Sequence, residues 1–269
     1  MLRLSIIVIA LWAIVSCDRV PGTGVTLHVN EVTGDDKAKL VTSDSIYEVA
    51  LDSTGTAVFV LPEGQQAGYA TLRYREAYLS LYVENGKDFN IDLKIEGENV
   101  TSRFAGKGAK KNEYLNKDVF AKFEPDFKAG ESDFIASLEV YEAEFNAILD
   151  SMGFDARFNE SEKKRLHYLA YCYLPSYIGA HMYMAGNMTY KPSDDYYNKL
   201  RELIQEDESL LDDDLYKKVL IEAIGTICSR DLEGDDVDFI FLKRQLDLVD
   251  KTIRNPAIAS YLVDLFVSY

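Results

Sequence analysis

Residues 81–115 read LYVENGKDFNIDLKIEGENVTSRFAGKGAKKNEYL, and a change of pattern inside this stretch decides the fold. Apolar and polar residues alternate from position 88 to 95, where the apolar ones are Phe89, Ile91, Leu93 and Ile95. A period of two is typical of a half-buried strand. After Gly106-Lys107-Gly108 the alternation stops, and apolar residues recur at helical spacing. These glycines therefore predict a turn that leads from a last strand into a first helix, and the motif lacks the Lys-Ser/Thr of a phosphate-binding loop.

The alternation extends upstream to about Gly24. It recurs in four further segments, namely 25–29, 47–51, 57–61 and 79–83. Asn85-Gly86 is a hairpin signal and predicts that the strand ending at Val83 pairs with the strand at Phe89. Seven or so short strands without a helical interruption favour an antiparallel β-sandwich over residues 24–105.

Downstream, residues 106–269 predict an all-α domain of about seven helices. Two apolar series have helical spacing: Phe134, Leu138, Tyr141, Phe145 and Ile148, then Phe239, Leu242, Leu246, Val249 and Ile253. Ser132, Ser193 and Asn255, which precedes Pro256, are candidate helix N-caps. Strands followed by helices indicate an α+β protein rather than a parallel βαβ sheet.

Residues 168–186 carry no Asp, Glu, Lys or Arg over nineteen positions. This length raises the question of a membrane span. However, the stretch also contains five tyrosines, His181 and Pro175. We therefore expect a kinked helix, or two short helices, at the centre of the helical domain.

The N-terminus, MLRLSIIVIALWAIVSC, predicts a signal peptide over residues 1–16. Arg3 supplies the positive charge, and the apolar run from Leu4 to Val15 is too short to span a bilayer. Ile14-Val15-Ser16-Cys17 resembles the lipobox of bacterial lipoproteins, in which the cysteine is lipidated before cleavage. The alternative is a buried cysteine at the end of a core strand. We expect Cys17 to carry the lipid and residues 17–23, which are rich in Pro and Gly, to form a tether.

Lipidation would anchor the mature protein to a membrane in the cell envelope, and we expect the outer membrane. The chain has a formal net charge of −16. Such a surface repels nucleic acid and anionic lipid headgroups, so neither is expected as an electrostatic partner.

Only Cys172 and Cys228 remain besides Cys17, and both lie in strongly apolar stretches. They are not in a Cys-x-x-Cys pair, so the chain has no dithiol redox motif of its own. We expect two buried free thiols, although an oxidising periplasm would also allow a single disulfide.

The chain contains no nucleophile elbow, zinc-protease helix motif or phosphate-binding loop, and we expect no catalytic residue, cofactor or metal. His167, Cys172 and His181 are candidate metal ligands, but Pro175 interrupts their helical register, which favours structural roles. Residues 231–238, DLEGDDVD, resemble a calcium loop but lack its glycine and its final glutamate. An acidic loop that caps the following helix is the preferred interpretation.

Tyrosine is unusually abundant, with eighteen in the chain. Eight of them crowd one part of the helical region: Tyr168, Tyr171, Tyr173, Tyr177, Tyr183, Tyr190, Tyr196 and Tyr197. Such side chains suit sugar or peptide recognition, and they suit packing between helices equally well. We expect packing.

Residues 81–89, LYVENGKDF, together with residues 104–115, FAGKGAKKNEYL, resemble segments of the thioredoxin-like thiol-disulfide oxidoreductase lipoproteins of gut Gram-negative anaerobes. The resemblance implies a lipobox, a β-sandwich and a helical middle region, and it covers nearly the whole chain. In that family a Trp-Cys-x-x-Cys motif in a following thioredoxin domain carries catalysis. This chain has no such motif, and its single tryptophan, Trp12, lies in the predicted signal peptide. No catalytic residue is carried over.

Three functions remain in view. The first is a non-catalytic, membrane-anchored accessory module, which would position a partner such as a thioredoxin-domain protein near a periplasmic substrate. The second is a truncated fragment of a thiol-disulfide oxidoreductase. The third is a glycan- or peptide-binding lipoprotein that uses the tyrosine-rich helices.

Overall fold

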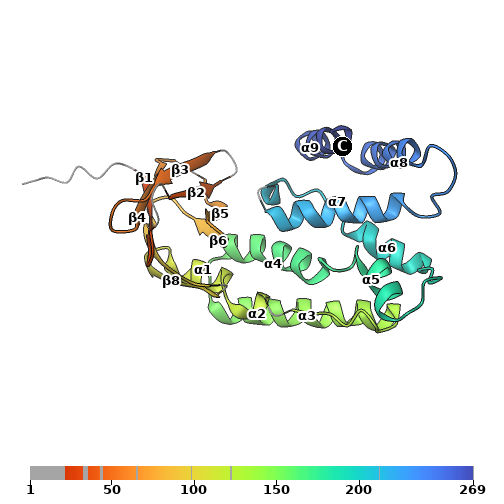
Figure 1. The fold of residues 1–269 in the computed structure, drawn as a ribbon, viewed down its shortest axis with the longest axis horizontal. Coiled ribbons are helices and arrows are strands. Elements are labelled where there is room, and N and C mark those ends of the chain that lie inside the picture. Colours follow the sequence, from red (N-terminus) through yellow and green to blue (C-terminus); the bar gives the residue numbers. More distant parts are fainter. Residues whose placement is uncertain are drawn as a thin grey trace, which may run out of the picture.

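The structure, a computed structural model, describes residues 22–268 except 33–35, 43–44, 65, 98, 122 and 212. Within this part of the chain strands come first and helices follow, which confirms the α+β class. Figure 1 shows the strands at one end of the molecule and the helices stacked beside them. The predicted signal peptide and Cys17 lie outside the described residues.

The strands form two four-stranded sheets, which pack face to face around a shared hydrophobic cluster. The first sheet has the order β4-β1-β7-β8, and the second has the order β3-β2-β5-β6. The strands are β1 (Gly22–Val29), β2 (Lys37–Val41), β3 (Ile46–Ala50), β4 (Thr56–Pro62), β5 (Gly68–Tyr74), β6 (Ala77–Val83), β7 (Phe89–Glu96) and β8 (Asn99–Gly106). β1 therefore includes Gly22 and Thr23, the last two residues of the predicted tether.

Alternate side chains fill the sandwich, as the period of two predicted. In β1 every second residue from Thr23 to Val29 is buried, and β7 buries Phe89, Ile91 and Leu93 in the same way. The opposite sheet contributes Leu40, Leu72 and Leu81, among others, to the same cluster.

The direction of one strand pair differs from the antiparallel expectation. β1 pairs antiparallel with β4 but parallel with β7, where Val25 lies opposite Phe89 and Val29 opposite Leu93. The remaining pairs are antiparallel. An alternating pattern identifies the buried face of a strand, but it contains no information about the direction of the neighbouring strand.

The hairpin predicted at Asn85-Gly86 is wrong, because β6 and β7 lie in different sheets. The turn itself is present: Lys87 N–H donates to the Glu84 oxygen at 3.1 Å, and Gly86 has φ +71°. Thr23 Oγ1 donates to Glu84 O at 3.0 Å and accepts from Gly86 N–H at 2.9 Å. The connection is therefore tied to β1 as it crosses from one sheet to the other.

The helices are α1 (Ala109–Leu115), α2 (Asp118–Ala121), α3 (Glu131–Met152), α4 (Ala156–Tyr171), α5 (Tyr177–Met184), α6 (Asp194–Glu202), α7 (Asp214–Cys228), α8 (Val237–Thr252) and α9 (Pro256–Val267), with a 3-10 turn at Glu208–Leu210. They outnumber the seven or so predicted, and α1 and α2 are short. The stacking seen in Figure 1 follows chain order: α4 packs on α3, α7 on α4, α8 on α7 and α9 on α8.

Two of the three predicted N-caps are confirmed. Ser193 accepts a hydrogen bond from Tyr196 N–H, and Asn255 accepts from Ala257 and Ile258, with Pro256 at the first helical position. Ser132 is not a cap, because α3 begins at Glu131 with Gly130 in the cap position. Glu131 and Asp133 are the acidic residues of its first turn, which suits the helix dipole.

The predicted interruption of the uncharged stretch 168–186 is present, but the stretch contains only the last four residues of the longer helix α4 before the short helix α5. α4 ends at Tyr171, a turned segment that includes Pro175 follows, and α5 begins at Tyr177. Among the described residues, no helix is both long enough and apolar enough to cross a membrane.

Candidate functional site

The sandwich and the helices meet through aromatic side chains on the outer face of the second sheet. Tyr69 of β5 and Tyr82 of β6 pack edge to face, with ring centroids 5.3 Å apart. The ring of Phe158, from α4, lies 4.8 Å from that of Tyr82. Both tyrosines belong to the hydrophobic cluster of the helical part, so the two parts share a continuous buried junction.

Asn112, on α1, takes the place of a neighbouring strand beside β6. Its Oδ1 accepts from Tyr82 N–H at 2.7 Å, and its Nδ2 donates to Tyr82 O at 3.2 Å. Asn116 donates to the Ser80 oxygen at 2.8 Å. β6 is an edge strand, so these amides satisfy backbone groups that would otherwise lack partners in a buried region.

The glycine turn before α1 is required by close packing. The N–H groups of Lys107 and Gly108 donate to Asp88 O at 2.8 and 3.4 Å. A Cβ on Gly108 would lie 2.7 Å from Phe89 Cδ1 and 2.9 Å from the Lys87 oxygen. The structural interpretation of Gly106-Lys107-Gly108 is thus supported by geometry, because a larger residue at position 108 would collide with β7.

Lys111 is a buried cation at the same junction. Its Nζ lies 2.9 Å from Glu84 Oε1 and 2.7 Å from Asp155 Oδ2. It also lies over the rings of Tyr82 and Phe158, at 4.9 and 4.8 Å from their centroids. The hydrogen bond from Lys111 is the main cause that lowers the pKa of Asp155. Lys111 therefore joins the β6–β7 connection to the start of α4.

A buried carboxylate marks the deepest point of the junction. Glu162, on α4, is 0% exposed, and Arg165 binds both of its oxygens at 2.8 and 2.7 Å. Tyr69 donates its hydroxyl hydrogen to Glu162 Oε2 at 2.6 Å. Burial, followed by the charge of Glu162, raises the pKa of Tyr69 well above its ordinary value. Both oxygens of Glu162 thus accept hydrogen bonds from side chains of the protein itself, and the carboxylate is fully buried, so we interpret this group as a structural one.

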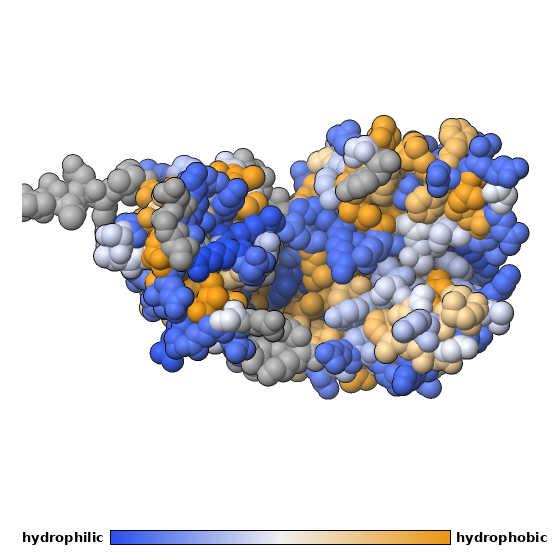
Figure 2. Space-filling view, in the orientation of Figure 1, coloured by the Kyte–Doolittle hydropathy of each residue, from blue (hydrophilic) through white to orange (hydrophobic). Residues whose placement is uncertain are grey.

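A cleft opens beside this group, with a cavity volume of about 560 Å³. Figure 2 shows a notch in the upper outline of the molecule where the two parts meet. The residues that give the cleft its chemistry are Tyr69, Thr71, Tyr78, Ser80, Arg165 and Asp213.

Two acidic side chains at the cleft, Asp213 and Asp214, have partners within the protein. Asp213 caps α7 by accepting from Tyr216 N–H at 2.9 Å. Burial raises the pKa of Asp213, while Arg165 acts to lower it. Arg73 Nη2 lies 3.3 Å from Asp214 Oδ2 and so links β5 to the start of α7. Concave sites of this kind at the meeting of two parts of a chain are common ligand sites.

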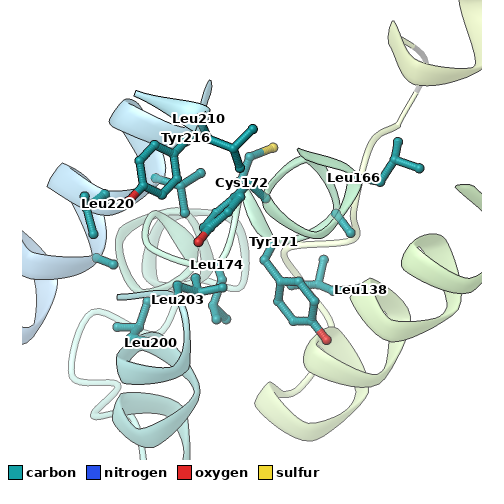
Figure 3. Close-up of a cluster of buried hydrophobic side chains, with 14 of the residues drawn as sticks. Leu138, Leu166, Tyr171, Cys172, Leu174, Leu200, Leu203, Leu210, Tyr216 and Leu220 are labelled. Carbon is teal, nitrogen blue, oxygen red and sulfur yellow. The ribbon is translucent and has the colours of Figure 1, made fainter. Parts of the chain in front are cut away.

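Both remaining cysteines are buried and free, which confirms the thiol prediction. Figure 3 shows Cys172 within the hydrophobic cluster where α4 meets α7, with Leu210 and Tyr216 among the cluster residues. Burial raises the pKa of Cys172 to about 11, and it raises the pKa of Cys228 to about 11 as well. Thiol-disulfide exchange needs an accessible thiolate, and neither sulfur offers one.

The two histidines considered as metal ligands have other partners. His167 Nδ1 lies 2.9 Å from Glu142 Oε1, and His181 Nδ1 lies 2.8 Å from the Phe127 oxygen. Within the described ranges, no three His, Cys, Asp or Glu side chains are grouped as metal ligands would be. In the acidic loop 231–238, Asp236 occupies the N-cap position of α8 and Asp238 lies in its first turn.

The crowded tyrosines pack between helices, as expected. Five of the eight are buried, namely Tyr168, Tyr171, Tyr177, Tyr196 and Tyr197. Tyr177 donates to Ala129 O and Tyr196 donates to Leu174 O, so their hydroxyl groups are used internally. Tyr183 is exposed. These contacts support packing between helices as the role of the buried tyrosines.

The Tyr69–Glu162–Arg165 group was not predicted from the sequence, although one signal for it was present. Glu162 lies between Phe158 and Leu166 at intervals of four residues, which places a charge on the apolar face of a helix. A charge in that position needs a buried partner. Comparison with known proteins finds no matching family model and no curated protein of similar sequence.

Proposed function

We propose that this chain is a lipid-anchored, non-catalytic accessory lipoprotein of the bacterial cell envelope. It is equivalent to the N-terminal half of the thioredoxin-like lipoproteins. In this role Cys17 carries the lipid, the outer membrane is the anchoring surface, and the folded part positions a partner protein.

The observation that carries this proposal is the contact between the two segments on which the resemblance rests. Tyr82 of the first segment pairs with Asn112 of the second, Glu84 with Lys111, and Asp88 with Gly108. The shared motif therefore builds the junction between sandwich and helices. A motif that packs the two layers together in this way favours a rigid support over an active site.

The buried thiols support the non-catalytic part of the proposal. Cys172 and Cys228 have raised pKa values and lie within the helical core. We expect the purified protein not to reduce insulin disulfides above background, with thioredoxin as the positive control. Turnover that is abolished by Cys172→Ala or Cys228→Ala would contradict the proposal.

The anchor is tested separately by Cys17→Ser. We expect this substitution to move the protein from the membrane fraction to the soluble periplasmic fraction, because no acyl chain is then attached. Cys228→Ser is the matched control, since it also removes a thiol but leaves the anchor, and it should remain in the membrane fraction. A Cys17→Ser protein that stays with the membrane after a carbonate wash would refute lipid anchoring.

A second candidate, a glycan- or peptide-binding lipoprotein, is favoured by the cleft at the junction. Its site would be the surface around Tyr78 and Arg165 instead of the tyrosine-rich helices. Tyr78 is exposed on β6, and Arg73 lies over its ring at 5.6 Å. Ligand titrations of the native protein and of Tyr78→Ala test this candidate, which predicts binding that the substitution abolishes.

A further inference from the structure

The last three helices leave an apolar groove that no part of the described chain fills. Its cavity volume is about 530 Å³, and its apolar lining is Ile221 of α7, Phe239, Phe241 and Leu242 of α8, and Leu265 and Phe266 of α9. Phe239 is 69% exposed, and Val267, further along α9, is 62% exposed. Figure 2 shows hydrophobic surface over α8 and α9, at the upper right. Patches of this kind on a soluble surface mark interaction sites.

One end of the groove is strongly acidic. Asp238 lines the groove itself, and Glu233, Asp235 and Asp236 lie in the loop immediately before α8. Within the described ranges none of these four carboxylates has an ion-pair partner. On α7 the two lysines that precede Ile221 by four and three residues are already engaged: Lys217 lies 2.8 Å from Asp214, and Lys218 lies 4.0 Å from Glu222. The opposing charges on α8 beside the groove are Lys243 and Arg244, and Arg244 donates to the Cys228 and Arg230 oxygens at 3.1 and 2.7 Å.

We propose that this groove binds an amphipathic helix of a partner protein that carries Lys or Arg beside its apolar face. The lining residues of α8 extend from Asp238 to Gln245, a helical rise of about 10 Å. Apolar anchors at positions i, i+3 or i+4, and i+7 of a partner helix cover the same length. Basic residues next to those anchors then meet the carboxylates at the Asp238 end of the groove.

Charge disfavours the two other occupants that an apolar groove suggests. A second copy of this chain would bring another acidic loop towards the first, in a protein whose formal net charge is already −16. An anionic lipid surface would be repelled for the same reason. A basic helix is attracted to the acidic end and gains apolar burial along the rest of the groove.

The probe is a fluorescein-labelled synthetic peptide with leucines at i, i+3, i+4 and i+7 and lysines elsewhere. Fluorescence anisotropy measures its binding to a protein that starts at residue 17 and carries the Cys17→Ser substitution. We expect saturable binding that weakens with added salt, since charge attraction contributes to it. A shuffled peptide with the same composition but no apolar face should bind at least about tenfold more weakly, because anchor residues dominate such interfaces. A peptide with Glu in place of Lys should bind equally weakly.

Matched variants locate the site. Phe239→Ala removes an exposed ring and should weaken binding at least about tenfold without affecting the melting temperature. Val140→Ala, which truncates a valine that is 57% exposed on α3, is the control and should leave the affinity unchanged. Asp235→Asn combined with Asp238→Asn should weaken binding and reduce its dependence on salt.

Several results would overturn the proposal. An affinity that Phe239→Ala leaves intact would place the peptide elsewhere, and equal binding of the shuffled or Glu-containing peptide would rule out the stated chemistry. A dimer seen by sedimentation that Phe239→Ala dissociates would make a second copy the occupant. These outcomes are independent of membrane anchoring, because every groove measurement uses the same Cys17→Ser background, which carries no lipid.

Discussion

Glu162 shows how a charged side chain is accommodated on the apolar face of a helix. It is fully buried, but Arg165 and Tyr69 satisfy its oxygens, and Arg165 is itself nearly buried. Burying such a pair costs desolvation energy, and removing one partner leaves the other charge uncompensated. The group is therefore stable only when all of its members are present.

We expect Glu162→Gln to lower the free energy of unfolding by about 3–5 kcal/mol, since the buried Arg165 charge then lacks a counter-ion. Urea denaturation followed by circular dichroism measures the change. Glu139→Gln is the matched control: Glu139 makes an exposed ion pair with Lys199 at 3.4 Å, and such pairs contribute about 0–1 kcal/mol. Equal losses in both variants would show that the buried group has no special role.

Glu131 connects the start of α3 to the start of α6. It accepts hydrogen bonds from Tyr190 at 2.6 Å and from the backbone N–H and hydroxyl group of Ser193. Burial acts to raise the pKa of Glu131, but the hydrogen bonds from Ser193 and Tyr190 outweigh it, and the pKa is lowered. A carboxyl group whose pKa is lower in the folded state contributes stability above its unfolded pKa.

We therefore expect this contribution at neutral pH and its loss as the pH falls from the ordinary value of 4.5 through the lower folded pKa. Glu131→Gln should destabilise the protein at pH 7 and have little effect at a pH below both values. Thermal melts across this range, with Asp133→Asn as a first-turn control, measure the difference. A destabilisation that is the same at every pH would contradict the assignment.

At the scale of elements, the sequence predicted which residues face the core but not which elements touch. The alternation in β1 and β7 and the caps at Ser193 and Asn255 are local signals, and the structure confirms them. The parallel pairing of β1 with β7 was not predicted, because the alternation of apolar and polar residues within a strand does not specify which strand lies beside it. The hairpin at Asn85-Gly86 failed because Thr23, more than sixty residues away, holds that turn in a crossover between sheets.

The Tyr69–Glu162–Arg165 group was not predicted either, because its members come from distant parts of the sequence. Tyr69 and Glu162 are separated by 93 positions, so no short motif could bring them together. By contrast, the burial of Cys172 followed from its apolar neighbours alone, which are a local property of the chain.

The turn between β8 and α1 gives a prediction for an element boundary. Gly108→Ala should lower the melting temperature, because its Cβ would press against Phe89 and the Lys87 carbonyl group. Gly130→Ala is the control, since no atom lies within 4 Å of a Cβ at that N-cap position. Differential scanning calorimetry of both variants checks this, and equal melting temperatures would contradict the packing argument.

At the scale of the whole molecule, the sandwich and the helices are coupled by a shared core. Tyr69 and Tyr82 of the sheet belong to the same buried cluster as the helical residues. Separating the two parts would expose these rings together with Lys111 and Glu162. We therefore expect the two parts to unfold together.

We expect a single unfolding transition in urea, with coincident curves from tyrosine fluorescence and far-ultraviolet circular dichroism. Tyr82→Ala should weaken the coupling and separate the two curves. Two transitions in the native protein would instead show that the junction contributes little.

The position of β1 has a mechanical consequence. β1 is the strand nearest to Cys17, and it lies between β4 and β7 in the interior of its sheet. A pull on the N-terminal end, such as a lipid at Cys17 would transmit, acts along the strand axis. The hydrogen bonds of a sheet run across the strands, so the bonds on both sides of β1 share this load in shear and do not open one after another. The end of the protein predicted to be tied to a membrane is thus an end at which two rows of strand hydrogen bonds oppose tension together.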